Sequence, residues 1–374
     1  MIYNDFKGKK LSALGFGTMR FPLNEDGSID EIKTGEMFDF AIKNGVNYFD
    51  TAWGYHAGQS ETVTGKLLKK YPRDSFYLAT KFPGYDVANF GKTEEIFNKQ
   101  LEKAGVDHFD FYLIHCVSEN NIEYYLDDEK YGTFKYLLKQ KELGRINHLG
   151  FSVHASNETM KRFLEKYGAV IEFCQVQFNW IDYEFQDAKT KLEMLKERDI
   201  PMWVMEPLRG GKLCQLESES EEKLKALRNN SNIPSWSFRF LQSFPEIKMI
   251  LSGMSDFEQV RDNIKTFSEF KPLDEYEKNT LFEIGKKMIK NVYACTGCNY
   301  CVTHCPQKIN IPGMISILND NVFNVGGKIS KNLLDEIDEC NRPSACISCK
   351  SCEKVCPQGL KISEIMSDFC KKTH

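Results

Sequence analysis

The sequence predicts an α/β fold, a TIM (β/α)8 barrel, followed by a small, mostly helical, cysteine-rich domain. Three observations carry this prediction. Before residue 270, short β-rich runs alternate with amphipathic helical stretches. Eight such strand–helix units fit into about 250 residues, which is the count of a TIM barrel. After residue 290, two cysteine runs with the same spacing replace this alternation.

The barrel strands are expected where apolar and β-branched residues cluster. They are residues 13–18, 47–52, 76–82, 110–116, 146–153, 173–180, 202–208 and 248–254. Helices are expected between them, chiefly at residues 31–45, 61–71, 94–105, 132–144, 158–168 and 187–199. We expect Asp30 and Ser60 to cap helix starts, because their side chains accept hydrogen bonds from free backbone N–H groups. On periodicity alone, a doubly wound parallel sheet remains the alternative fold.

Length and charge limit the remaining possibilities. The 374 residues allow one large and one small domain, and we place them at residues 1–288 and 289–374. A net charge of −4 without a basic tract argues against nucleic acid and against an anionic membrane surface. The N-terminal MIYNDFKGKK has no apolar signal core, and no stretch approaches the ~20 apolar residues of a membrane span. We therefore expect a cytoplasmic protein.

Each cysteine run has the form C-x2-C-x2-C-x3-C-P, the first from Cys295 and the second from Cys346. Structural zinc sites typically use two well-separated pairs of ligands. The spacing here is instead the bacterial ferredoxin pattern for a [4Fe–4S] cluster. Zinc binding, or chance spacing, is the alternative. The second domain is therefore predicted to be ferredoxin-like and to hold two [4Fe–4S] clusters.

In two-cluster ferredoxins the fourth cysteine of each run binds the other run's cluster. Carried over to this chain, one cluster would be held by Cys295, Cys298, Cys301 and Cys356. The second would be held by Cys346, Cys349, Cys352 and Cys305. The connection between the runs is longer than in compact bacterial ferredoxins, and it resembles helical ferredoxin modules fused to reductases. Cys340 and Cys370 lie outside both runs, and we expect them to be spare thiols.

Polar residues end three consecutive expected strands. FDTAWGY carries Asp50 and Tyr55, LATKF carries Lys81, and YLIHC carries His115. Each residue alone has an ordinary structural explanation. TIM-barrel chemistry, however, sits where strands give way to βα loops. The four together favour the barrel over the doubly wound sheet and predict a catalytic site.

These motifs closely resemble the aldo-keto reductase family over residues 10–285. The resemblance rests on GFGTM at 15, NYFDTAWGY at 47, ATKF at 79, YLIH at 112, GFS at 150, QVQFN at 175 and EPLRGGKL at 206. The fused ferredoxin-type domain matches a recognised subgroup. The resemblance implies an NAD(P)-dependent oxidoreductase that interconverts an aldehyde or ketone and an alcohol, with hydride from NAD(P)H and no metal in the barrel.

The family chemistry gives each of the four residues a role. Hydride arriving at a carbonyl carbon leaves an alkoxide, so an acid must protonate the oxygen. Tyr55 would be this general acid, and Lys81 would lower its pKa. Asp50 would pair with Lys81 and orient it, while His115 would donate a hydrogen bond to the substrate oxygen.

The resemblance also indicates a cofactor pocket. Its expected residues are Gly17, Thr18, Met19, Ser152, Gln175, Met205, Gly253, Ser255, Gln259 and Asn263. Two positions depart from the family pattern. Val153 replaces the asparagine that usually follows Ser152. Gln259 stands where an arginine usually binds the 2′-phosphate, and loss of that guanidinium weakens the expectation of NADPH over NADH.

Aromatic residues are expected around the substrate. The long segment after His115 carries Tyr124, Tyr125 and Tyr131, and Trp53 and Trp180 would lie at the same rim. Long βα loops at this face usually form a pocket or lid. Such a pocket suits a small carbonyl or alcohol compound that is flat or apolar.

The two halves of the chain handle electrons differently. Nicotinamide transfers a two-electron hydride, whereas a cubane passes one electron at a time. A flavin is therefore a possible mediator, and an external ferredoxin or flavoprotein a possible partner. The main alternative is a non-catalytic, regulatory barrel whose ferredoxin domain serves as an electron wire in a larger complex. A purely structural role for the clusters is a third possibility.

Overall fold

A computed structural model describes residues 1–290, 292–293, 295, 300–322, 329, 334, 337–356 and 358–373. The chain forms two compact units. The first comprises Met1–Gly210 and Pro234–Lys278, and the second comprises Gly211–Ile233 and Asn279–His374. None of the described helices combines the length and apolar character that crossing a bilayer requires.

The first unit is built around a closed barrel of parallel strands, in the order β10-β3-β4-β5-β6-β7-β8-β9. Every expected strand is present. The strands are β3 (Leu14–Gly17), β4 (Tyr48–Asp50), β5 (Tyr77–Phe82), β6 (Phe109–Val117), β7 (Ile146–Val153), β8 (Phe173–Gln177), β9 (Met202–Met205) and β10 (Ile247–Gly253). The last strand pairs with the first, from Ile250↔Leu14 to Gly253↔Gly17. This closure confirms the TIM barrel and excludes the doubly wound sheet.

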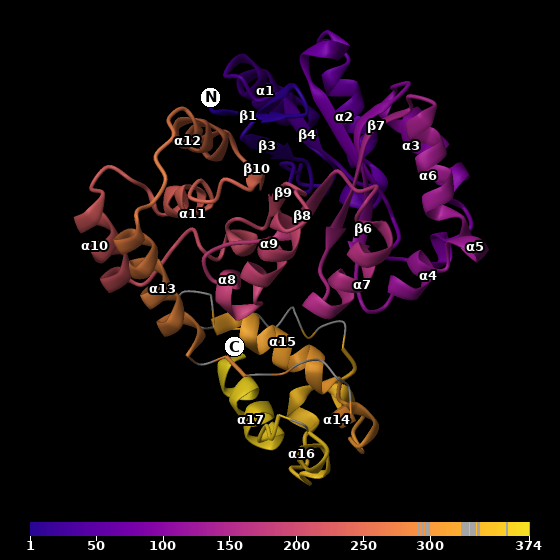
Figure 1. The fold of residues 1–374 in the computed structure, drawn as a ribbon. Coiled ribbons are helices and arrows are strands. Elements are labelled where there is room, and N and C mark those ends of the chain that lie inside the picture. The colour runs from indigo at the N-terminus through magenta and orange to yellow at the C-terminus, as the bar shows by residue number, and fades with distance from the viewer. Residues whose placement is uncertain are drawn as a thin grey trace. The chain divides into compact units, whose positions relative to one another are not determined.

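Helices follow the strands and surround the barrel (Figure 1). They include α1 (Glu31–Lys43), α2 (Ser60–Leu68), α3 (Thr93–Ala104), α6 (Thr133–Glu142), α7 (Asn157–Tyr167), α9 (Ala188–Lys196), α11 (Ile233–Leu241) and α12 (Phe257–Phe267). Shorter helices are α4 (Ile122–Leu126), α5 (Asp128–Tyr131) and α8 (Asp182–Phe185). Asp30 caps α1 as expected, by accepting from the Lys33 N–H. The expectation for Ser60 is wrong, because its hydroxyl is buried and bonded to Thr18 and Thr51 instead.

The second unit is mostly helical. Its helices are α10 (Ser218–Leu227), α14 (Tyr300–Thr303), α15 (Ile311–Val322), α16 (Ser351–Lys354) and α17 (Ile362–Lys372), and α13 (Glu275–Ile289) continues into it. Apolar side chains from α15 and α17, such as Leu318 and Phe369, form a small core. Cys301 and Cys352 are buried in this core. The cysteine-rich segments therefore fold around one hydrophobic centre.

An N-terminal hairpin closes the amino end of the barrel. It consists of β1 (Tyr3–Phe6) and β2 (Lys9–Ser12). Lys7 and Gly8 form the two-residue turn with positive φ values, as a type I′ turn requires. Phe6 enters the barrel and packs against the rings of Trp203 and His148, 5.0 Å away between centroids in each case. The sequence did not predict this hairpin, because its strands are only four residues long and mostly polar.

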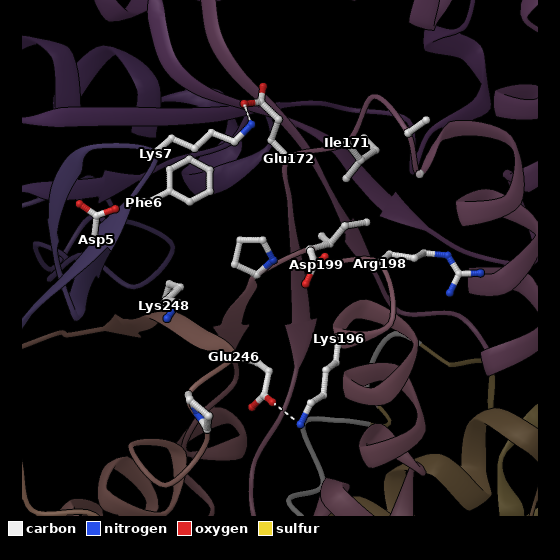
Figure 2. Close-up of a pocket in the computed structure, with 15 residues that line it drawn as sticks. Asp5, Phe6, Lys7, Ile171, Glu172, Lys196, Arg198, Asp199, Glu246 and Lys248 are labelled. Atoms are coloured by element: carbon white, nitrogen blue, oxygen red, sulfur yellow. Dashed lines mark hydrogen bonds and ion pairs between the residues drawn. The ribbon is translucent and has the colours of Figure 1, made fainter.

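A charge cluster at the same end joins the hairpin to the barrel. Glu172 accepts bonds from Lys7 at 2.7 Å and Lys141 at 2.6 Å, and it lies 2.9 Å from His148 Nδ1. Figure 2 shows the Lys7 bond and, in the same pocket, a separate pair between Lys196 and Glu246. Burial pushes the pKa of Glu172 upward, but its bonds to His148, Lys141 and Lys7 hold it far below its ordinary value.

Glu172→Gln should reduce stability at neutral pH by roughly 3 kcal/mol, because it removes a mostly buried carboxylate that three donors share, of which the His148 ring is itself mostly buried. A carboxyl group with a lowered folded pKa stabilises the fold above its ordinary pKa, and this contribution is lost as the pH falls. The variant should therefore lose less stability than the wild type between about pH 5 and pH 2. Urea unfolding across this pH range measures both effects.

Glu246→Gln in the same pocket is the matched control. Glu246 pairs with one lysine whose side chain is 67% exposed, so its removal should cost under about 1 kcal/mol. Equal losses in the two variants, or an unchanged acid limb in Glu172→Gln, would contradict this account of the barrel end.

Candidate functional site

At the carboxyl end of the barrel, the structure brings Asp50 and Lys81 together. Asp50 ends β4, and Lys81 stands near the end of β5, the neighbouring strand. Both side chains are almost completely buried. Lys81 Nζ donates to Asp50 Oδ1 at 2.5 Å and to the Thr51 carbonyl at 2.8 Å. Burial alone would lower the pKa of Lys81, but Asp50 and Tyr55 outweigh it and raise that pKa. The lysine is therefore held charged.

Tyr55 begins the short 3₁₀ helix η1 (Tyr55–Gly58), next to this ion pair. Lys81 Nζ lies 5.1 Å from the centre of the Tyr55 ring. The two residues after Tyr55, His56 and Ala57, both have φ of 51°, a strained conformation that non-glycine residues rarely adopt. The Phe21 N–H holds this turn by donating to His56 Nε2 at 3.1 Å. Strain of this kind is typical of functional loops.

The pKa of Tyr55 differs from the expectation. Burial raises the pKa of the phenol, and the Lys81 cation lowers it by less than burial raises it. The nearby carboxylates of Asp50 and Glu206 also raise it. The expected influence of Lys81 is present, but the net shift is upward. Tyr55 therefore keeps its proton throughout the neutral pH range.

A bulge in β6 orients the His115 side chain. The pairing of β6 with β7 shifts register between Ile114 and Val117, and Cys116 has φ of 57°. The Cys116 N–H donates to Ser152 Oγ at 2.8 Å, and Asn121 Nδ2 donates to the Cys116 carbonyl at 2.8 Å. Bulges often re-aim side chains next to active sites. Here hydrogen bonds hold both the N–H and the carbonyl group of the bulged residue, Cys116.

Two tyrosine rings meet the His115 ring. Its centroid is 6.2 Å from that of Tyr55 and 5.2 Å from that of Tyr85, both edge-on. Burial and the Lys81 charge bring the pKa of His115 well below its ordinary value, so the ring is neutral at pH 7. Its Nδ1 is buried with no hydrogen-bond partner among the described residues, which leaves Nε2 as the nitrogen available to a substrate.

Sequence reasoning missed Tyr85 and the support beneath Lys81. Tyr85 follows β5 by three residues, so the rule that found the other four could have found it. Gln100 Nε2 donates to the Lys81 carbonyl at 2.9 Å and to Glu61 at 2.7 Å. Glu61 also bonds Lys103, whose Nζ lies 4.6 Å from the Trp53 ring centre. No local sequence pattern marks this buried network, because Lys81 lies on β5, Glu61 on α2, and Gln100 and Lys103 on α3.

The expected aromatic rim is partly wrong. Trp180 is only 2% exposed, and its Nε1 donates to Ser237 Oγ, so it belongs to the core. Tyr125 is fully buried and donates to the His115 carbonyl at 3.1 Å. Tyr124 and Tyr131 pack against each other, with centroids 5.2 Å apart. These tyrosines shape the loop behind His115.

Ser152 and Gln175 stand opposite each other on β7 and β8. Gln175 Oε1 is buried without a hydrogen-bond partner in the described part of the chain. Ser152 Oγ accepts from the Cys116 N–H, so its own proton can still be donated. A carboxamide carries the complementary groups, an NH₂ donor and a C=O acceptor. The pair therefore fits a nicotinamide carboxamide, although Val153, beside Ser152, is buried and apolar.

The other expected cofactor residues divide by their contacts. Gly17 pairs with Asp50 at the barrel mouth, and Thr18 donates its hydroxyl to the Asp50 carbonyl at 3.0 Å. Met19 is 54% exposed, and Met205 ends β9 half-buried. Met19 and Met205 thus offer side chains that are neither buried nor already bonded.

Residues at the end of β10 mainly organise the start of α12. The Ser255 N–H donates to Gln259 Oε1 at 2.9 Å, and Gln259 Nε2 donates to Asp256 at 2.6 Å. Asn263 Nδ2 donates to Ser252 at 3.1 Å, and Gly253 is exposed at the end of the strand. Gln259 therefore takes part in the hydrogen bonds at the start of α12. It occupies the position where the family pattern has a phosphate-binding arginine.

In the second unit, four cysteines line one cavity: Cys305, Cys346, Cys349 and Cys352. This is the complete second ligand set expected from the sequence. Apolar side chains, including Ile309, Ile311 and Met366, form the rest of the wall. A cubane needs four thiolates from one enclosure, and this donor set fits it.

The remaining cysteines are less fully described. Cys301 is buried, and Cys295 and Cys356 pack half-buried against the same core. Cys298 lies outside the described residues. Cys340 and Cys370 are exposed and do not line the cavity. In the described ranges, no three His, Cys, Asp or Glu side chains are grouped as ligands of a single metal ion.

Comparison with known families matches both parts of the chain. Residues 13–286 match the model of the aldo/keto reductase family. Residues 294–361 match the 4Fe-4S dicluster domain. The fused arrangement expected from the sequence is confirmed.

Individual relatives are distant. L-galactose dehydrogenase of Arabidopsis thaliana is 25% identical over 306 residues, covering 74% of this chain and 90% of that protein. NADH-specific methylglyoxal reductase of Escherichia coli is 23% identical, covering 68% and 89%. Probable aldo-keto reductase 1 of Glycine max is 31% identical over 189 residues, 46% of this chain and about half of that relative (49%).

Solved structures share the barrel fold. The holo form of aldo-keto reductase AKR11C1 from Bacillus halodurans superposes with a TM-score of 0.62 at 21% identity, covering 76% of this chain and 96% of that chain. An aldo-keto reductase from Klebsiella pneumoniae in complex with NADPH gives 0.61 at 18% identity, covering 76% and 95%.

Proposed function

This chain belongs to the aldo/keto reductase family, and on that premise we propose that its barrel interconverts an aldehyde or ketone and an alcohol, using NAD(P)H. One observation carries the proposal. The buried Lys81–Asp50 ion pair lies beside the Tyr55 ring, and the Tyr55 ring meets His115 edge-on. Four residues from separate segments thus offer a proton, a hydrogen bond and a fixed positive charge at one place.

Each residue has one task in the proposed reaction. Tyr55 gives its proton to the substrate oxygen as the carbonyl becomes an alkoxide, which is a far stronger base than a phenolate. The Lys81 cation stabilises the phenolate that remains, and Asp50 keeps Lys81 charged and in place. Neutral His115 donates from Nε2 to the same oxygen and orients the carbonyl.

The nicotinamide cofactor would supply the hydride when bound. Ser152 and Gln175 would hold its carboxamide, and the unpartnered Gln175 Oε1 supports this placement. Gly17, Thr18 and Met19 would lie along the cofactor on one side, with Met205 against the ring. Gly253, Ser255, Gln259 and Asn263 would form the adenosine side. NADH is as acceptable as NADPH here, because Gln259 carries no charge for a 2′-phosphate.

The substrate would be a small carbonyl compound. The relatives include an L-galactose dehydrogenase and a methylglyoxal reductase, and both names point to small, polar substrates. Tyr85 and Trp53 are aromatic side chains near the site that, like Tyr55, are at least partly exposed. An assay panel should therefore begin with aldoses and short α-oxoaldehydes.

We propose that residues 289–374 hold two [4Fe–4S] clusters and that residues 1–288 form the catalytic domain. The two runs of four cysteines each, the match to the 4Fe-4S dicluster domain and the cavity of four cysteines support the clusters. The flavin mediator stays a prediction, because its only support is the mismatch between two-electron hydride transfer and one-electron cluster transfer. The regulatory-barrel alternative has less support, because a barrel without chemistry would have no use for the buried ion pair beside Tyr55.

Tyr55→Phe should lower carbonyl reduction by about 10²–10⁴-fold, since it removes the proton donor and keeps the ring. Nicotinamide affinity should change little. Steady-state rates with NADH or NADPH, and cofactor binding followed by fluorescence, measure the two quantities.

Tyr85→Phe is the matched control, because the Tyr85 ring also meets the His115 ring edge-on, whereas in the described part of the chain the Lys81 charge lies against the Tyr55 ring. It should stay within a few-fold of the wild type. Turnover in Tyr55→Phe equal to that of the wild type or of Tyr85→Phe would rule out Tyr55 as the acid.

Cys349→Ser should halve the iron content of anaerobically prepared protein, from about eight to about four iron atoms per chain, because each cubane holds four. Cys370→Ser, which changes an exposed thiol outside the cavity, should keep the full content. Iron and sulfide assays on both variants test this. Stoichiometric zinc without iron, or equal iron in the two variants, would refute the ligand assignment.

A further inference from the structure

The loop that carries two of the cavity cysteines reaches the surface. Residues 347–350 are exposed, and the Ile347 side chain is 59% exposed. Ile347, Cys349 and Lys350 also line the cavity of four cysteines. One wall of this cavity is therefore a thin, exposed loop with an apolar side chain at its centre.

The backbone of this loop is held in an unusual shape. Ser348 has φ of 53° and Lys350 has φ of 60°, so two non-glycine residues adopt the left-handed region close together. Such conformations persist where the surrounding structure imposes them, and they cluster at functional sites. The loop then enters α16, which places Cys352 in the core.

Three lysines lie at, or within two positions of, residues that line this cavity. Lys308, Lys350 and Lys354 are exposed and form no ion pair in the part of the chain that the structure describes. Lys308 follows Cys305 by three residues, and Lys354 follows Cys352 by two. The one carboxylate within α16, Glu353, accepts two bonds from Ser363 at 2.5 and 2.8 Å. It faces α17 and is engaged there.

We propose that this surface, which we call the basic docking surface and define by Ile347, Cys349, Lys308, Lys350 and Lys354, binds an acidic protein that carries one electron at a time. The inference rests on the proposed cluster at Cys305, Cys346, Cys349 and Cys352. An apolar centre inside a charged rim is the usual composition of a transient protein interface. Lysine charges would steer an acidic partner and raise its association rate.

The redox step is simple. One electron leaves the reduced carrier protein and enters the cluster, so the carrier is oxidised as the cluster is reduced, and no bond or proton changes place. A second copy of this chain is a poorer occupant, because a two-fold contact would set the same lysines against one another. The one-electron carrier also matches what a cubane can exchange.

The probe is an acidic plant-type [2Fe–2S] ferredoxin, because its spectrum differs from that of cubanes. Its reduced form is mixed anaerobically with the cluster-loaded full chain, and electron entry is followed by stopped-flow absorbance. Binding of the oxidised form is measured by calorimetry. The test variant is Lys350→Glu/Lys354→Glu. The control is Lys223→Glu/Lys225→Glu on α10, which makes the same change in net charge away from the cysteine segments.

Lys350→Glu/Lys354→Glu should slow electron entry from ferredoxin by at least about tenfold at low salt, with weaker binding of the oxidised form. The wild-type rate should fall as ionic strength rises, because salt screens these charges. Ile347→Ser should weaken binding without changing the salt dependence. The control variant should match the wild type, and reduction by dithionite should be equal in all proteins.

Iron content is measured first, because it tests the proposed cluster separately from the docking surface. A chain that assembles no cubane overturns the proposed cluster and this inference with it. Full iron together with equal ferredoxin rates in the test and control variants overturns the docking surface alone. So does a wild-type rate that is independent of salt, or a dimer that the Ile347→Ser substitution dissociates in sedimentation.

Discussion

The proposed chemistry depends on one buried ion pair, Lys81 with Asp50. A lysine cation out of contact with water is costly unless a charge partner and further hydrogen bonds compensate. Asp50 and the Thr51 carbonyl supply them at 2.5 and 2.8 Å. The barrel makes this possible, because adjacent parallel strands deliver both side chains to the same, carboxyl end. Burial sets the direction of the pKa shifts of Tyr55 and His115, and this fixed charge acts on both groups as well.

The surrounding backbone is shaped to bring the other two residues to the pair. Tyr55 is followed by two left-handed residues, and His115 precedes a bulge that Ser152 and Asn121 hold. Ser152 thus connects the His115 bulge to the proposed carboxamide site. In the second unit, comparable left-handed positions at Ser348 and Lys350 expose the cysteine loop. Strain lies in both units where a reactive group has to face outward.

Periodicity and strand-end chemistry predicted the eight barrel strands and the four clustered residues, because both follow from local sequence. Long-range effects were not predictable. The β1–β2 hairpin depends on Phe6 entering a barrel that is complete only in three dimensions. Trp180 was expected at the rim, but in the fold its Nε1 donates to Ser237 on α11 and the side chain is buried. The upward pKa shift of Tyr55 reflects burial, which no motif reports.

The central claim is that the barrel passes hydride from a nicotinamide to a carbonyl carbon. The most direct measurement uses NADH and NADPH carrying deuterium at the transferable position, incubated anaerobically with the aldehydes and ketones of the assay panel. Mass spectrometry of the alcohol product should find one deuterium on the former carbonyl carbon, with no label when only the solvent is deuterated. A product labelled from solvent, or no consumption of either nucleotide with any of these compounds, would contradict the account.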